Sequence, residues 1–152
     1  MATRADFNAD EWAVIATAPT LAAMSVSAAD RGGSLSESLA AARAYAAARE
    51  QNATGLLKDL LSSPPSIDRS AGLEAVKEAP ARLRDAIRTL ERQATDDQVN
   101  EYKRFVYSVA EAVAHAHKEG GFLGIGGKPV SAAEQAALDE IAALFDEAPP
   151  AA

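Results

Sequence analysis

The stretch TDDQVNEYKRFVYSVAEAVAHAHK, residues 95–118, decides the fold. Large apolar residues recur in it at every third or fourth position: Val99, Tyr102, Val106, Val109 and Val113. This spacing is the period of an α-helix that buries one face. Thr95 and Gln98 have the spacing of a capping box, in which each side chain bonds the other residue's backbone at a helix start. The sequence therefore predicts a helix over about Asp96–Lys118, the longest in the chain.

Helices are also predicted on both sides of this stretch. Downstream, Ser131 and Glu134 repeat the capping-box spacing and begin a last helix. Its inward stripe comprises Ala137, Leu138, Ile141, Leu144 and Phe145. Upstream, apolar residues at helical period mark a region from Leu73 to Leu90. Pro80 lies inside this region and predicts either a kink or the first turn of a new helix.

The start of the chain predicts two short helices. Asn8 and Glu11 have capping-box spacing and indicate a helix from Ala9. Its inward face comprises Trp12, Ile15 and Ala16. Pro19 lacks the N–H that continues a helix, so we expect it to stop or kink this one. A second helix is then predicted over Thr20–Asp30, and its inward residues are Leu21, Met24 and Ala28.

A third helix follows the Gly32-Gly33 turn. Ser34 and Glu37 form its capping-box pattern. Apolar residues at helical period then continue through Leu39, Ala42, Ala46, Leu56, Leu57, Leu60 and Leu61, with a break expected near Asn52 and Gly55. Residues 62–67 contain Ser-Ser-Pro-Pro-Ser and are predicted to form an ordered connector.

Together these patterns predict an all-α fold, a compact bundle of about six helices in a single domain over residues 1–152. About a quarter of the chain is alanine, the best helix former and a poor strand residue. No segment alternates apolar and polar residues for long enough to predict a strand. Residues 119–130 form a glycine-rich loop, and we expect the tail over residues 148–152 to be loose.

Charge and composition exclude several classes of function. The net charge is −7, which disfavours nucleic acid as a partner. The chain has no cysteine, so disulfides, thiol catalysis and cysteine-ligated metals are excluded. Residues 1–10 lack an apolar signal-peptide core. We identify no apolar run of the 18 residues that a membrane span requires, and therefore expect a cytoplasmic protein without a membrane span.

The two halves of the chain share one pattern. Residues 22–48 and 109–144 each give an alanine-rich helix, a Gly-Gly turn, a Ser-x-x-Glu cap and a second alanine-rich helix. In this alignment Asp30 matches His117, and Glu37 matches Glu134. Two similar helical hairpins related by pseudo-symmetry explain the pattern. Shared composition without duplication explains it equally well.

The glycine-rich loop does not fit a phosphate-binding motif. Gly127-Lys128 is followed by Pro129, where a P-loop needs serine or threonine. The loop instead holds three large apolar residues among glycines: Phe122, Leu123 and Ile125. Such residues either fold back on their own domain or bind a partner. We expect a protein partner or self-association at this loop if they do not fold back.

Two further groups of charged residues are candidate sites. Arg84, Arg88 and Arg92 have i, i+4 spacing and form either a solvated helix face or a basic docking face. Glu111 and His115 share a helix face, but two ligands do not make a metal site. No serine, histidine and acid combination indicates a catalytic site, so we expect no enzyme activity.

Two segments resemble the tellurite-resistance TerB-like family. They are Ala28-Ala29-Asp30 with Gly32-Gly33 and Glu37, and Val130-Ser131-Ala132-Ala133-Glu134 followed by Leu138 and Ile141. The resemblance implies an all-α bundle, a stress-associated cytoplasmic role, and binding to other proteins instead of catalysis. The alternative function is binding of a divalent metal ion or small ligand. On that alternative, the acidic positions Asp30, Glu37 and Glu134 are the metal ligands, and no other cofactor is expected.

Overall fold

The computed structural model describes residues 1–29, 35–51, 53, 55–62, 72–119 and 130–146. A short 3-10 turn, η1 (Arg4–Asp6), precedes six α-helices. They are α1 (Ala9–Ala29), α2 (Leu35–Glu50), α3 (Gly55–Leu61), α4 (Gly72–Glu91), α5 (Asp96–Glu119) and α6 (Ala132–Asp146). No strand occurs within these ranges. The predicted all-α bundle of about six helices is confirmed.

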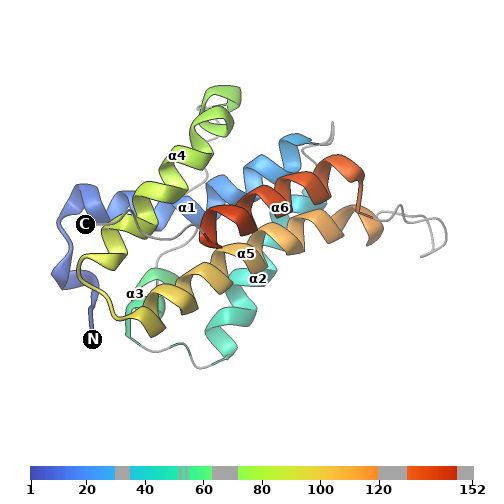
Figure 1. Cartoon of the computed structure of the whole chain (residues 1–152). Coiled ribbons are helices and arrows are strands. Elements are labelled where there is room, and N and C mark those ends of the chain that lie inside the picture. Colours follow the sequence, from blue (N-terminus) through green and yellow to red (C-terminus); the bar gives the residue numbers. More distant parts are fainter. Residues whose placement is uncertain (30–34, 52, 54, 63–71, 120–129, 147–152) are drawn as a thin grey trace.

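Helices α1 and α5 form the centre of the bundle, as Figure 1 shows. Helix α4 packs mainly on α1, α2 packs mainly on α5, and α6 packs on both central helices. Helix α2 makes few contacts with α1, although the two are consecutive in the chain. The N-terminal end of α4 extends away from the other helices. The two turns of the predicted hairpins lie outside the described residues, so their pseudo-symmetry stays a prediction.

Pro19 does not end a helix, which corrects the prediction of two helices in this region. Helix α1 runs through it from Ala9 to Ala29. Because Pro19 has no N–H, the Ile15 carbonyl has no donor at position i+4. The Tyr102 hydroxyl of α5 donates to this carbonyl at 2.7 Å, inside the core. A tertiary hydrogen bond thus replaces the missing helical one and allows α1 to continue.

Three of the four predicted capping boxes and the stripe of α5 are confirmed, whereas the predicted box of Ser34 and Glu37 lies outside the described residues. Reciprocal hydrogen bonds join Asn8 with Glu11, Thr95 with Gln98, and Ser131 with Glu134. The predicted break between α2 and α3 is also present, and Gly55 there has a φ of 56°, which favours glycine. All five predicted stripe residues of α5 are buried: Val99, Tyr102, Val106, Val109 and Val113.

The inward faces predicted for the alanine-rich helices are partly wrong. In α1, Leu21 is buried as expected, but Ala28 is exposed, whereas Val26 is fully buried. Among residues 39–50 of α2, Ala41 and Tyr45 are buried, and Leu39 is 49% exposed. Alanine occurs on every face of these helices, so hydrophobic contrast does not fix their rotation. Packing on α5 decides it instead.

The prediction that no segment is long and apolar enough to cross a membrane is also wrong. Residues 12–29 of α1 carry no charge over 18 positions. By length and composition α1 passes the test for a membrane span, and it is the one described helix that does so. Half of this stretch is buried by the other helices. The core helix of a globular protein passes the same test, because core helices and membrane-spanning helices are both apolar over most of their length.

The first residues of the chain are bound to the bundle by backbone hydrogen bonds. The Gln98 side-chain oxygen accepts from the Ala2 N–H at 2.9 Å, and its amide nitrogen donates to the Ala2 carbonyl at 2.8 Å. The Arg4 N–H donates to Asp59 of α3 at 3.0 Å. The Arg4 guanidinium also lies over the Trp12 ring, 4.9 Å from its centroid. These contacts close the end of the bundle where α3 and α5 begin.

We predict that Tyr102→Phe lowers the free energy of unfolding by about 1–3 kcal/mol, because it leaves the buried Ile15 carbonyl without a donor. Urea denaturation measures this change. The control is Tyr107→Phe on the same helix, where the side chain is only half-buried. It should change stability by less than about 0.5 kcal/mol.

A second substitution separates the hydrogen bond from packing. Pro19→Ala restores an N–H within reach of the Ile15 carbonyl. In this background the cost of Tyr102→Phe should fall below about 0.5 kcal/mol, as a double-mutant cycle would show. An equal cost in both backgrounds contradicts the assigned role of the hydroxyl.

Candidate functional site

An apolar groove of about 380 Å³ lies where α1, α4 and α6 meet. Helix α1 contributes Ser25 and Ala29 near its C-terminal end, and α4 contributes Val76, Pro80 and Leu83. Leu83 is buried at the base, whereas Val76 and Pro80 are half-buried. Helix α4 runs through Pro80, so the alternative that a new helix begins there is wrong. Pro80 leaves the Val76 carbonyl without a helical donor. The groove is thus next to the end of α4 that extends from the bundle in Figure 1.

The opposite wall is one flank of α6, and half of its lining residues are alanine. Ile141 and Leu144 are buried at its base. Above them are three alanines, Ala133, Ala136 and Ala137, of which the first two are exposed. A methyl side chain leaves the helix backbone close to the surface, so another helix can approach it closely. The groove therefore results from small side chains on α6 facing larger ones on α4.

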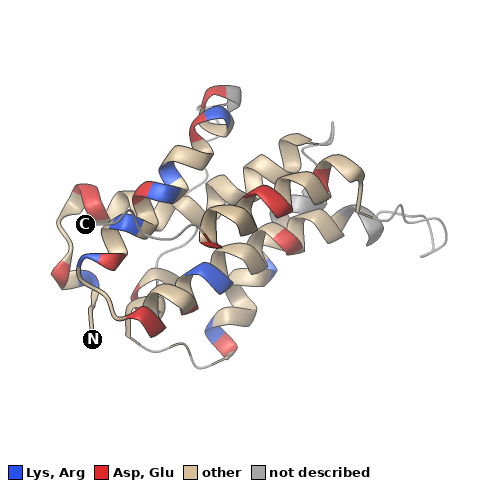
Figure 2. Ribbon diagram, viewed as in Figure 1, with Lys and Arg blue, Asp and Glu red and all other residues tan. Residues whose placement is uncertain are grey.

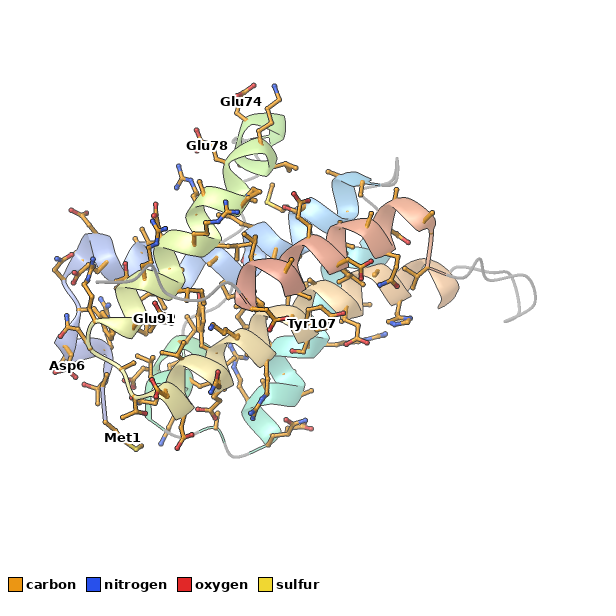
Figure 3. The ribbon with its side chains drawn as sticks, viewed as in Figure 1. Met1, Asp6, Glu74, Glu78, Glu91 and Tyr107 are labelled. Carbon is orange, nitrogen blue, oxygen red and sulfur yellow. The ribbon has the colours of Figure 1, made fainter. Side chains whose placement is uncertain are left out.

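Among the described residues that line the groove, Glu140 is the one that carries a charge. Its side chain is exposed, and no described residue forms an ion pair with it. Other charges near the extended end of α4 are paired within that helix. Lys77 lies 3.2 Å from Glu74, and Arg82 lies 2.9 Å from Glu78. Figure 3 places Glu74 and Glu78 at the end of α4 that extends from the bundle.

The predicted basic face on α4 is divided among different roles. Arg92 donates to Glu11 of α1 at 3.2 Å and so joins the C-terminal end of α4 to the start of α1. Arg84 is half-buried and has a partner within the chain. Arg88 is exposed. Figure 2 shows blue and red segments alternating along α4. A docking role for this face stays a prediction, and Arg92 already serves an intramolecular contact.

Glu134, one of the three candidate metal ligands, is a helix cap. Its side chain is 1% exposed, and its carboxylate accepts from the Ser131 N–H at 2.9 Å. The Asp30 position and the Glu37 side chain lie outside the described residues, so their metal role stays a prediction. No group of three or more histidine, aspartate or glutamate residues is close enough to bind a metal within the described part of the chain. Glu111 and His115 share a face as predicted, 3.7 Å apart.

The candidate partner-binding loop is not part of the described structure. Phe122, Leu123 and Ile125 all fall in residues 120–129. Whether they fold back or bind a partner therefore stays open. The groove was not predicted from the sequence, because its walls come from three helices that are far apart in the chain. The available signal was the combination of Val76, Pro80 and Leu83 on one face of α4.

Two buried tyrosines lie where α1, α2 and α5 meet. The Tyr45 ring packs edge-on against Phe105, with the ring centroids 5.0 Å apart. Burial raises the pKa of Tyr45, while the nearby Thr20 hydroxyl and the charge of Arg49 lower it. Burial, with a smaller contribution from Tyr45, holds the pKa of Tyr102 well above its usual value. The Thr20 and Tyr45 hydroxyls lie near each other but do not reach hydrogen-bonding geometry in the described structure. Both tyrosines are therefore neutral at physiological pH.

Comparison with known proteins adds no assignment: no family model, curated protein or solved structure matches this chain.

We predict that the advantage of wild type over Tyr102→Phe shrinks above pH 10. An unfolded tyrosine ionises near pH 10, whereas folded Tyr102 keeps its proton to a higher pH. The unfolded state then binds fewer protons, so stability falls as pH rises toward the folded pKa, by up to about 1.4 kcal/mol per pH unit. Urea denaturation of both proteins from pH 8 to 11 measures this difference. The upper limit lies about one pH unit above the pKa of an unfolded tyrosine. A constant difference contradicts the prediction.

Removing the cap of α6 tests the role of Glu134. Ser131→Ala removes the hydroxyl that accepts from the Glu134 N–H at 3.1 Å, and should cost about 1 kcal/mol. Ser108→Ala is the control, because that hydroxyl donates only to a carbonyl of its own helix and is exposed.

Melting with magnesium, manganese and zinc ions tests the metal alternative. A rise in Tm that Glu134→Gln abolishes supports a metal role, since ligands stabilise the state they bind.

Proposed function

We propose that this chain is a non-enzymatic interaction module that binds a helical segment of a partner protein in the groove between α1, α4 and α6. The groove itself is the observation that carries the proposal. It is apolar along α4 and the base of α6, and its exposed wall is alanine. Helix-in-groove recognition uses this arrangement, in which an amphipathic helix places its apolar side chains between two others.

An extended partner fits this groove better than a small molecule. Pockets for small ligands enclose most of the ligand surface. Here the groove opens to solvent along exposed Ala133, Ala136 and Glu140. A helix lying along α6 buries its inward face and leaves its outward face in water. Such a partner also requires no chemistry from the residues that line the groove.

The resemblance to TerB-like proteins supports the same type of function. It rests on the segments around Asp30 and around Glu134, and it implies a cytoplasmic, stress-associated module that binds other proteins. We include this location and role in the proposal. Ala133 belongs to the second segment, and Ala137 lies between Glu134 and Leu138 of the same segment. The resemblance and the groove therefore overlap on the first turns of α6.

The proposal is tested at two exposed alanines of α6. A photo-crosslinking amino acid at position 136 identifies the partner in native cells, and its affinity is then measured with purified proteins. Ala136→Arg places a long charged side chain in the groove and should weaken binding at least about tenfold, or 1.4 kcal/mol. Arginine is a good helix former, so α6 should remain intact.

Ala143→Arg is the matched control, because Ala143 is also exposed on α6 but does not line the groove. It should leave the affinity unchanged. Equal affinity of both variants for the partner contradicts the proposed function.

A further inference from the structure

We infer that the partner helix presents a lysine or arginine to Glu140, next to an apolar stripe of large side chains. This inference rests on the proposed function and specifies the chemistry of its partner. The observation behind it is the exposed carboxylate of Glu140, because the other described residues that line the groove are uncharged.

Glu140 differs from the other acids beside the groove in having no ion-pair partner among the described residues. Glu74 and Glu78 are each within ion-pair distance of a cation on α4. Its neighbour Asp139 accepts a hydrogen bond from Gln135 at 2.9 Å on the solvent face of α6. A helix that covers the groove removes water from Glu140, and an unpaired carboxylate is costly to bury. The occupant must therefore supply a cation at this position.

The charge of the whole chain favours the same kind of partner. The net charge of −7 attracts a basic helix during encounter and repels an acidic one. A second copy of this chain carries the same excess of negative charge. Pairing two copies across this groove by a two-fold axis would also bring the two Glu140 side chains to the same interface. Charge complementarity thus selects a basic partner over self-association.

The walls also specify the size of the partner's apolar side chains. Ala133, Ala136 and Ala137 are small and leave space along the groove, and Ala29 on α1 adds to it. Close packing requires this space to be filled by large residues such as leucine, isoleucine or methionine. The expected partner surface is thus a helix with a large aliphatic stripe at i, i+3, i+4 and i+7, with a basic residue at its edge.

Synthetic helical peptides provide the test. The probe is a labelled peptide of about five turns with leucines at this spacing and lysines along both edges of the stripe. A matched peptide has glutamate in place of every lysine. Binding of each to the full chain is measured by fluorescence anisotropy. The lysine peptide should bind, and the glutamate peptide should bind at least about fivefold more weakly.

Two charge-reversal variants then locate the cation. Glu140→Lys and Asp139→Lys change the net charge of the chain equally, but only residue 140 lines the groove. Glu140→Lys should weaken the lysine peptide about five- to tenfold and strengthen the glutamate peptide. Asp139→Lys should change either affinity by less than about twofold. Equal effects of the two variants overturn the inference, because they show attraction by net charge alone.

The failure of this inference is distinguishable from that of the proposed function. If Ala136→Arg abolishes binding of both peptides while Glu140→Lys matters no more than Asp139→Lys, the groove binds helices without the assigned ion pair. If Ala136→Arg changes nothing, or neither peptide binds, both proposals fail. Sedimentation of the wild type shows whether a second copy occupies the groove, in which case Ala136→Arg turns a dimer into a monomer and the inference is overturned.

Discussion

One hydrogen bond between α5 and α1 determines how the bundle is built. Pro19 leaves the Ile15 carbonyl without a helical donor, and the Tyr102 hydroxyl supplies one at 2.7 Å. An unpaired carbonyl at this depth would be costly, so α1 remains a single long helix only while α5 lies against it. Helix α1 in turn supports α4 and α6. The groove requires all three, and its existence therefore depends on a contact in the core below it.

The sequence predicted the parts of the fold that local chemistry determines. The three capping boxes that are described formed as expected because their residues are only three positions apart. The stripe of α5 was predicted because valine and tyrosine contrast with charged neighbours on the other faces. The continuity of α1 was not predicted, because the donor that replaces the N–H of Pro19 is 87 residues away from Ile15. Alanine-rich faces gave no contrast, so the rotation of α2 and of the second half of α1 was also not predictable.

In the candidate site, too, local features were predictable from the sequence and contacts between distant helices were not. A cap at Glu134 was expected from its spacing to Ser131, and the structure confirms it. The groove could not be predicted, because exposed alanines on α6 gain meaning only when Val76 and Pro80 of α4 face them. The chain has 22 acidic residues, and nothing in the sequence distinguishes Glu140 from the others. Its position in the fold sets it apart, because it lies exposed beside an apolar groove and no described residue forms an ion pair with it.

The side chain of Gln98 couples local unfolding of the first residues to local unfolding at the start of α5. Its oxygen accepts from the backbone of both Ala2 and Thr95, and its nitrogen donates to Ala2. One amide group thus serves the beginning of the chain and the beginning of α5 simultaneously. Release of the first residues leaves this buried amide without two of its bonds and weakens the cap of α5. Fraying, which is usually independent at each terminus, is here coupled to the central helix, so the chain start belongs to the same cooperative unit as the core.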